Sequence, residues 1–519
     1  MKARLMFRDR DFDLQEPPSH RYRREAQVVP KVVPNEDALT QDLELNTLFN
    51  AMAGGDTLLF QVARQAVLSG LHNDRETILY RQAILQDCLK NYSVVRNIYA
   101  AAVETIESEK RRWYGVFSRR YPGSILGSGV DLVQLYMETL GKLKLLADEH
   151  AGQFASEGFR AFFALLEAEL PDEYFVAVEA HLKELKFRGG VLESAELGKG
   201  NQGANYVLRK SLAKKPGWLR RLLTRQPPAY TFRLHERDEA GARALGELRD
   251  RGINLVANAL AQSADHVLAF FVTLRRELAF YLGCVNLHRH LGRKGAPVCF
   301  PEPTLAGEPR HSCVGLRDAC LALSMDRTVV GNDLNAAGKR LVIITGANQG
   351  GKSTFLRSLG LAQLMMQCGM FVAAESFSAD ICHGLFTHYK REEDASMKSG
   401  KLDEELSRMS GIVDALTPNS VLLFNESFAA TNEREGSEIA RQIVRALLET
   451  RVKVFFVTHL YKFAHGLCED KMDSAIFLRA ERQADGRRTF KLVPGEPFQT
   501  SYGADLYEEI RSATANCVA

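Results

Sequence analysis

The residues LVIITGANQGGKSTFLRSL, from Leu341 to Leu359, decide the fold of this chain. Four apolar residues and a threonine lead into Gly346, and Gly351-Lys352-Ser353 follows after four further positions. Apolar residues at 355, 356 and 359 then recur at helical spacing. The stretch therefore predicts a strand, a G-x-x-x-x-G-K-[ST] loop and a helix, which is the required context of a phosphate-binding loop.

The residue types of this loop suit a nucleoside triphosphate. Glycines at 346, 350 and 351 let several backbone N–H groups converge on phosphate oxygens, and the following helix directs its positive end at the same place. Lys352 is expected to bridge the β- and γ-phosphates and the Ser353 hydroxyl to bind Mg²⁺. A glycine-rich turn before an ordinary helix is the alternative, but the strand and helix on either side favour the phosphate loop.

Length and composition set broad limits. The chain has 519 residues, enough for roughly three domains. The net charge of +3 neither requires nor excludes nucleic acid, so any basic binding face must be local. The nine cysteines form no C-x-x-C pair. The start MKARLMFRDRDFD is charged where a signal peptide is apolar, and the longest apolar runs have the length of a β-strand rather than of a membrane span. We expect a cytoplasmic protein with free thiols and no membrane span.

The order of patterns along the chain predicts three regions. Residues 1–45 are predicted to be an N-terminal arm, of which residues 1 to about 38 are polar, basic and proline-bearing and are expected to be extended or partly ordered. Residues 46–298 carry apolar residues at helical spacing, with long stripes at about 130–170 and 236–291 and a break at 70–74 between two shorter helices. Residues 299–519 follow a Pro/Gly-rich connector and alternate strands with helices, as an α/β domain does.

An insert at about 186–233 interrupts the helical region. Its first part has glycines and alternating residues that predict a hairpin. Its second part surrounds Trp218 with a basic cluster, namely Lys214, Lys215, Arg220, Arg221 and Arg225. Such a cluster suits contact with a phosphate backbone, and an ordinary solvated loop is an equal alternative on composition alone.

Two further strands are expected to complete the nucleotide site. SVLLFNE, Ser420 to Glu426, is apolar and ends in a polar pair. The usual pair is Asp-Glu, in which the Asp serves the metal and the Glu polarises the attacking water. Here Asn425 takes the metal-side position without a negative charge, while Glu426 keeps the role of base. A third strand, VKVFFVTH, ends at His459, which is placed to sense the γ-phosphate and orient water.

These motifs together resemble the MutS family, the ATPases of DNA mismatch repair. TGANQGGKST is similar to the family's TGPNMGGKST loop, including Asn348 and Thr354, and SVLLFNESFAATNEREG is similar to its Walker B and D-loop run. Residues 457–459 match its A-T-H switch, residues 501–503 its S-Y-G, and residues 330–333 its V-P-N-D loop on the nucleotide side, which contains Asn332. DRETILYRQAILQDCLKN resembles the start of its core domain.

The resemblance implies a fold and an activity. The fold is an α/β P-loop (ABC-like) ATPase domain preceded by an all-α core and lever domain with a small inserted clamp-like segment. The activity is hydrolysis of ATP with Mg²⁺, in a homodimer formed through the ATPase domains. Because the family's clamp touches the DNA backbone, the resemblance favours the DNA reading of the basic cluster.

Three departures from the family limit this expectation. Mismatch readers carry a Phe-x-Glu wedge, and that triplet does not occur before residue 290. About 45 N-terminal residues cannot house both a mismatch-reading and a connector domain, so we expect a short member without them. The trans-acting S-T-F-M-x-E signature reads GKLDEE at 400–405, retaining Glu405, with Lys401 or Ser399 as substitute contacts to a partner's phosphate. About 16 residues follow S-Y-G, which shortens the family's C-terminal helices.

The leading hypothesis is a MutS-like ATP-dependent DNA-binding protein related to mismatch repair. One alternative is a nucleotide-gated protein-interaction module, favoured by the near-neutral charge. Another is a slow ATPase that acts on branched or recombination DNA without recognising mismatches, because Asn425 adds no charge to the metal site.

Overall fold

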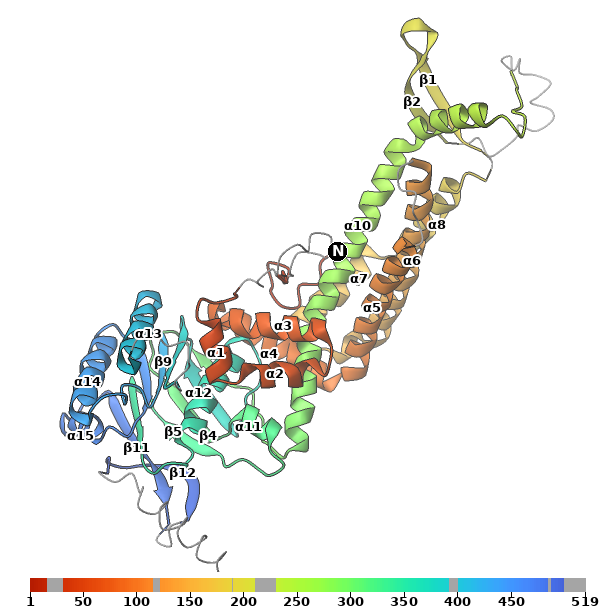
Figure 1. The fold of residues 1–519 in the computed structure, drawn as a ribbon. Helices are drawn as coiled ribbons and strands as arrows, with labels where there is room; N and C mark the ends of the chain where they lie inside the picture. Colours follow the sequence, from red (N-terminus) through yellow and green to blue (C-terminus); the bar gives the residue numbers. More distant parts are fainter. Residues whose placement is uncertain are drawn as a thin grey trace, which may run out of the picture. The chain divides into compact units, whose positions relative to one another are not determined.

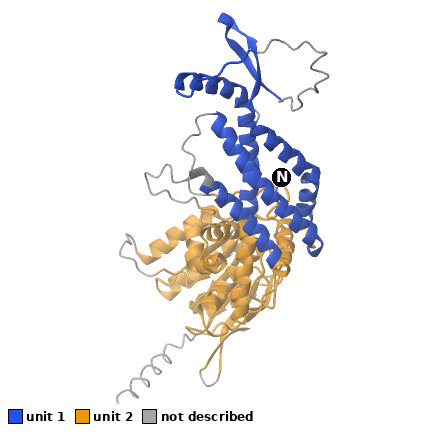
Figure 2. Ribbon diagram, turned by 90° about the vertical axis from the view of Figure 1, so that its right-hand side faces the viewer, with its two compact units in different colours: residues 1–3, 93–154, 159–275 blue, residues 4–92, 155–158, 276–519 orange. Residues whose placement is uncertain are grey.

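The chain is described by a computed structural model at residues 1–15, 31–114, 122–188, 190–210, 230–391, 400–483 and 487–498. These residues form a helical region and three β-sheets (Figure 1). Contacts divide the chain into two compact units (Figure 2). Unit 1 comprises residues 1–3, 93–154 and 159–275, and unit 2 comprises residues 4–92, 155–158 and 276–519. The mixed α/β class therefore agrees with the sequence prediction.

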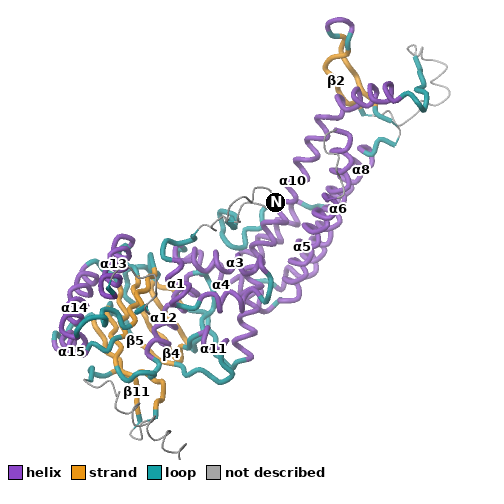
Figure 3. The backbone as a smooth tube through the Cα atoms, in the orientation of Figure 1, coloured by secondary structure: helices purple, strands orange, loops and turns teal. Residues whose placement is uncertain are grey.

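Unit 1 is mainly helical (Figure 3). Its helices are α5 (Tyr92–Tyr114), α6 (Pro122–His150), most of α7 (Glu157–Glu169), α8 (Asp172–Leu185) and the first part of α10 (Glu239–Arg293). A small core buries Leu126 of α6 against Ile253 and Ala257 of α10. Apolar packing thus explains the long sequence stripes.

The two stripes have different outcomes. The pattern at 236–291 is confirmed as one continuous helix, α10. The pattern at 130–170 is instead two helices, because the chain turns through Ala151–Gln153 between α6 and α7. The Asp87 carboxylate accepts the N–H groups of Ala155 and Ser156 at 3.0 and 2.7 Å. A distant carboxylate therefore stabilises the break.

The predicted hairpin in the insert is confirmed. Strands β1 (Leu192–Leu197) and β2 (Gly203–Arg209) pair antiparallel. Gly200, at φ +69°, lies in the connection between them. The basic cluster, Lys214, Lys215, Arg220, Arg221 and Arg225, lies outside the described residues.

Among the described residues, α10 alone has the length and apolar composition of a membrane-crossing helix. The core helix of a soluble protein meets the same criterion, and α10 supplies core residues to unit 1. This is weak support for a membrane span, and we assign none.

Unit 2 begins with residues that the sequence predicted to be an arm. The N–H groups of Leu5 and Phe12 donate to the buried Glu277 carboxylate at 2.6 and 3.0 Å. The Arg81 Nε donates to the carbonyl oxygen of Met6 at 2.9 Å. Residues 4–14 are therefore held against α4 (Arg75–Lys90) and the end of α10, which corrects that part of the prediction.

Four helices follow in unit 2, namely α1 (Glu36–Asp42), α2 (Leu45–Ala53), α3 (Thr57–Ser69) and α4 (Arg75–Lys90). The predicted break at 70–74 is confirmed, and the Asp74 side chain caps α4 by accepting the Thr77 N–H at 2.8 Å. Asn73 in this break donates to the Gln367 carbonyl oxygen at 2.9 Å. The break thereby contacts the end of the helix that follows the glycine loop.

A six-stranded sheet forms the centre of the C-terminal part of unit 2. Its order is β12-β11-β6-β10-β9-β8, all parallel except β12. The strands are β6 (Leu341–Thr345), β8 (Leu385–Tyr389), β9 (Val421–Asn425), β10 (Lys453–Val457), β11 (Ala475–Arg482) and β12 (Arg488–Pro494). The accompanying helices are α12 (Lys352–Gln367), α13 (Lys401–Ala415), α14 (Glu433–Glu449) and α15 (Tyr461–Glu469). Because β6, β9 and β10 are parallel neighbours, their carboxyl ends share one edge.

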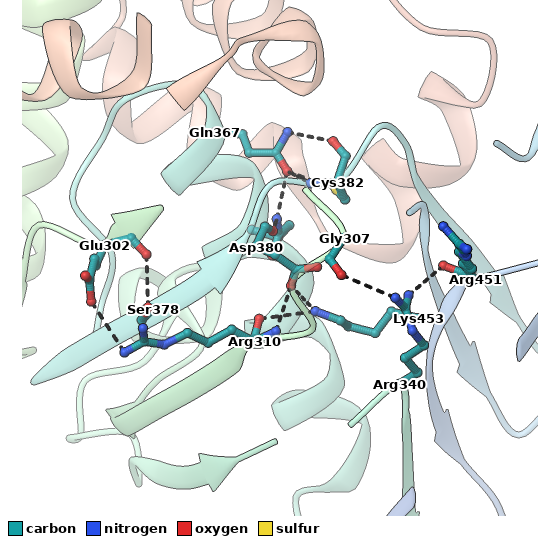
Figure 4. Close-up of polar contacts among 11 residues, drawn as sticks. Glu302, Gly307, Arg310, Arg340, Gln367, Ser378, Asp380, Cys382, Arg451 and Lys453 are labelled. Atoms are coloured by element: carbon teal, nitrogen blue, oxygen red, sulfur yellow. Dashed lines mark hydrogen bonds and ion pairs between the residues drawn. The ribbon is translucent and has the colours of Figure 1, made fainter. Parts of the chain in front are cut away.

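A four-stranded sheet, β3-β7-β4-β5, lies beside the first, and α11 (Ala319–Ser324) follows β4. Its strands are β3 (Glu302–Thr304), β4 (His311–Leu316), β5 (Asn332–Asn335) and β7 (Ser376–Asp380). Figure 4 shows the buried pair that joins the two sheets, Asp380 of β7 and Lys453 of β10. Gln363 of α12 donates to the Asp380 carbonyl oxygen at 2.9 Å. This network fixes α12, and hence the loop before it, relative to both sheets.

The unit boundaries differ from the predicted domains 1–45, 46–298 and 299–519. Residues 4–92 cluster with 276–519, and the boundary falls inside α10. The reason is that α1 to α4 contact β3, β8, α11 and α12.

The eight described cysteines are free, and six of them are buried. Burial raises their thiol pKa values, for example that of Cys368 to about 12. The prediction of free thiols is confirmed for the described residues.

Candidate nucleotide-binding site

The glycine loop joins β6 to α12, and close packing explains its glycines. Gly346 and Gly351 have φ of +115° and +88°, which few other residues adopt. A Cβ at Gly346 would lie 2.8 Å from the Ala480 backbone nitrogen, and one at Gly350 would lie 2.7 Å from the Ala480 Cβ. Helix α12 begins directly after the loop without a side-chain cap, so its N-terminal N–H groups face the loop.

Lys352 is buried at the start of α12. Its Nζ donates to the carbonyl oxygens of Gly346 and Ala347 at 3.0 and 2.9 Å and lies 3.3 Å from the His459 Nε2. Burial lowers the pKa of Lys352 to about 8, partly opposed by the charge of Glu426. The ammonium is therefore inside the loop, where phosphate would replace backbone carbonyls as its partner.

The two predicted magnesium ligands are adjacent. The Ser353 hydroxyl donates to the Asn425 Oδ1 at 2.8 Å. Asn425 is the last residue of β9 and pairs with Val457 of β10. The site thus offers two neutral oxygen donors, a type that Mg²⁺ accepts, without the carboxylate of the usual Walker pair.

Glu426 and His459 also come together. The His459 Nε2 lies 3.0 Å from the Glu426 Oε1. The hydrogen bond from His459 is the largest cause of the lowered pKa of Glu426. Glu426 is thus an ionised acceptor at neutral pH, in contact with the residue that ends the next strand.

The other predicted residues are placed as follows. Asn348 is exposed and Thr354 half-buried, at the loop and the first turn of α12. Asn332 is buried, and its side-chain amide forms two hydrogen bonds with the backbone of β12. Its Nδ2 donates to the Phe490 carbonyl oxygen at 3.1 Å, and its Oδ1 accepts the Leu492 N–H at 2.7 Å. Its observed contacts are structural, so a nucleotide contact by Asn332 stays a prediction.

The polar groups next to Glu426 include two that sequence reasoning missed, His388 and Ser427. His388 lies within the buried strand β8, and its Nδ1 lies 2.7 Å from the Ser427 Oγ. The local signal was a histidine in a fully buried strand, LFTHY, and it does not tell which residue the imidazole contacts. Of the trans-signature residues, Glu405 accepts the Phe428 N–H at 2.8 Å, Lys401 opens α13, and Ser399 lies outside the described residues.

Comparisons with known proteins cover both parts of the chain. The family model described as the MutS2 N-terminal domain matches residues 73–294, and the model described as MutS domain V matches residues 342–512. DNA mismatch repair protein MutS of Thermus aquaticus is 33% identical over 178 residues, which are 34% of this chain and 22% of that protein. Endonuclease MutS2 of Lacticaseibacillus casei is 33% identical over 209 residues, 38% of this chain and 26% of that protein.

MutS protein homolog 4 of Mus musculus is 31% identical over 143 residues, 28% of this chain and 15% of that protein. The chain thus spans between 15% and 26% of the length of these three relatives. The two family models, which lie on either side of the connector, agree with each other and with the motifs of the glycine loop. The chain belongs to the MutS family.

Proposed function

We propose that this protein is an ATPase that binds ATP with Mg²⁺ and couples closure of an ATPase homodimer to DNA binding, in mismatch repair or a related process. The observation that carries the proposal is the meeting of Lys352, Ser353, Asn425, Glu426 and His459 at the ends of β6, β9 and β10. They offer a phosphate-binding cation, two oxygen ligands, a base and an orienting imidazole: His459 contacts both Lys352 and Glu426, and Ser353 contacts Asn425.

The residues suggest a division of labour. The loop N–H groups and Lys352 bind the phosphates, while Ser353 and Asn425 hold the magnesium ion. A bound magnesium ion would supply charge neutralisation of the triphosphate. Glu426 accepts the proton of the attacking water, and His459 orients the Glu426 carboxylate from 3.0 Å.

Two variants test the nucleotide site. Lys352→Ala is expected to lower ATP affinity at least tenfold, because it removes the buried cation of the loop. Glu426→Gln is expected to keep ATP affinity and to lower single-turnover hydrolysis by about 10² to 10⁴, the usual contribution of a general base. Lys339→Ala is the control, because Lys339 is a half-buried lysine before β6 whose Nζ donates to the Asp473 carbonyl oxygen, outside the glycine loop. If Glu426→Gln hydrolyses ATP at the wild-type rate, Glu426 is not the general base.

The DNA part of the proposal rests on the family and on the basic cluster. Duplex, mismatched and branched DNA are compared by anisotropy with and without ATP, using wild type and the Arg220→Glu, Arg221→Glu double variant. We expect ATP-dependent binding that the variant loses and that weakens with salt. The proposal of DNA binding would be refuted if the affinity for DNA were no greater than that of a charge-matched protein in every nucleotide state.

The net charge of +3 favours one second candidate, a nucleotide-gated module whose partner is a protein. Under that alternative the Arg220 and Arg221 charge reversal leaves ATP-dependent dimerisation and function unchanged. The same double variant therefore separates the two candidates.

A further inference from the structure

The turn that follows β9 has an unusual backbone. Glu426 and Phe428 have φ of +55° and +62°, in the left-handed region that residues with a side chain seldom adopt. Phe428 is also fully buried. Two such residues in three positions persist only when neighbouring groups hold them, and one of them is the proposed catalytic base.

His388 holds the middle of this turn. It lies on β8, in register with Phe424 of β9, and is fully buried. Its Nδ1 is 2.7 Å from the Ser427 Oγ, which is itself 2.6 Å from the His388 carbonyl oxygen. The imidazole also stacks on the Phe428 ring, with centroids 5.3 Å apart and planes at 20°. Both residues that follow Glu426 therefore contact one side chain.

Helix α13 holds the end of the turn. The buried Glu405 carboxylate accepts the Phe428 N–H at 2.8 Å. The Glu405 carbonyl oxygen lies 3.0 Å from the His388 Nε2. His388 and Glu405 thus connect α13 to the turn through two separate hydrogen bonds.

The hydrogen atoms in this network can be assigned. Burial lowers the pKa of His388 to about 4, so its ring is neutral at physiological pH. Nε2 faces a carbonyl oxygen, which only accepts, so Nε2 carries the hydrogen and Nδ1 is an acceptor. The single Ser427 hydroxyl hydrogen then has two acceptors, Nδ1 and the His388 carbonyl oxygen. The neutral ring therefore donates to α13 and accepts from the turn.

We propose that His388 is a positioning residue for ATP hydrolysis, which fixes the left-handed turn at Glu426–Phe428 to α13 and so aims the Glu426 carboxylate at the attacking water. The inference rests on the proposed function. It predicts an effect on the chemical step rather than on nucleotide binding, because the described hydrogen bonds of the His388 and Ser427 side chains go to each other and to Glu405, not to the glycine loop. A displacement of α13 would reach Glu426 through the same bonds.

The test uses two graded variants of the full chain. His388→Phe keeps a buried aromatic ring against Phe428 and deletes both nitrogens. Ser427→Ala removes only the hydroxyl. In both variants we expect kcat and the single-turnover rate to fall at least tenfold, while KM and the affinity for ATP stay within twofold of wild type.

A double variant and a matched control sharpen the test. The His388→Phe, Ser427→Ala double variant is expected to be no slower than the worse single variant, because both changes break the same link. Ser378→Ala is the control: Ser378 is another buried serine, whose hydroxyl donates to the Glu302 carbonyl oxygen at 3.1 Å in the four-stranded sheet (Figure 4). Its kcat is expected to equal that of wild type.

Three results would overturn the inference. They are an unchanged kcat in Ser427→Ala, additive losses in the double variant, and an equal fall of kcat in Ser378→Ala. If His388→Phe does not fold, Ser427→Ala alone decides. If the wild-type protein neither binds nor hydrolyses ATP, the proposed function itself is wrong. If the wild type is active and Ser427→Ala is equally active, only the positioning role of His388 is wrong.

Discussion

At the scale of single residues, Lys352 connects the fold to the chemistry. Its ammonium is buried among backbone carbonyls, and that burial lowers its pKa to about 8. Under the proposed function the phosphates of ATP require the charged form of Lys352, so nucleotide binding and protonation are linked. Above the pKa of the free protein, the bound phosphates draw a proton onto Lys352.

The linkage predicts proton uptake when ATP binds. At pH 8.5, calorimetry in two buffers of different ionisation enthalpy should show uptake of about three quarters of a proton, and at pH 7 the uptake should be about a tenth of a proton. Lys352→Arg should bind ATP without uptake, because a guanidinium stays charged throughout. Equal binding heats in the two buffers at pH 8.5 would contradict the prediction.

Residue types and spacing predicted five contacting groups of the candidate site: Lys352, Ser353, Asn425, Glu426 and His459. They could be predicted because each follows a strand of one parallel sheet, whose carboxyl ends meet at one edge. His388 and Ser427 could not, since no local pattern tells which distant residue a buried imidazole will contact.

At the scale of elements, two helical glycines give a matched comparison. A Cβ at Gly436, in the first turn of α14, would lie 2.3 Å from the Phe428 carbonyl oxygen, whereas a Cβ at Gly411 of α13 would meet nothing within 4 Å. The first glycine is required by the turn that carries Glu426, and the second is not.

Alanine at these two positions should therefore have opposite effects. Gly411→Ala should stabilise the protein by about 0.5–1 kcal/mol, since it only lowers the entropy of the unfolded chain. Gly436→Ala should destabilise it by about 1–3 kcal/mol and slow hydrolysis, because the Phe428 backbone must move. Urea unfolding and single-turnover assays measure both effects, and a stable, fully active Gly436→Ala would show that the turn adapts.

Periodicity predicted α10 and the break before α4 well, because each has a local signal: a continuous apolar stripe, and the capping residue Asp74. The same reasoning wrongly predicted one long helical stretch where the structure has the two helices α6 and α7. The apolar spacing does continue across the turn, and the carboxylate that stabilises the break, Asp87, comes from α4. Such tertiary contacts are invisible to a local window.

At the scale of the whole molecule, the first residues of the chain show how composition can mislead. A polar, basic start suggested an arm, yet Leu5 and Phe12 donate to Glu277, more than 260 positions away. Burial raises the pKa of Glu277 to about 7, although those two N–H groups lower it in part. The folded protein thus binds a proton at Glu277 more tightly than the unfolded chain does.

This raised pKa predicts a pH dependence of stability. The contribution of Glu277 is fully present below about pH 4.5 and is lost as pH rises to about 7, by up to about 3 kcal/mol. The urea midpoint of wild type relative to Glu277→Gln should therefore fall between pH 5 and 7 and be constant above it. Glu449→Gln, at the exposed end of α14, is the control. A difference that is constant from pH 5 to 8 would show that Glu277 does not titrate in this range.

The distribution of the buried cysteines has a practical consequence. The sequence places all nine cysteines within the ranges of unit 2, and none within those of unit 1. The buried thiols react only when the surrounding structure opens. The rate at which these thiols are alkylated therefore measures the transient opening of unit 2. Unit 1 has no cysteine for the same reagent to modify. If added ATP or DNA slows the alkylation, the change can therefore be assigned to unit 2 without introducing a label.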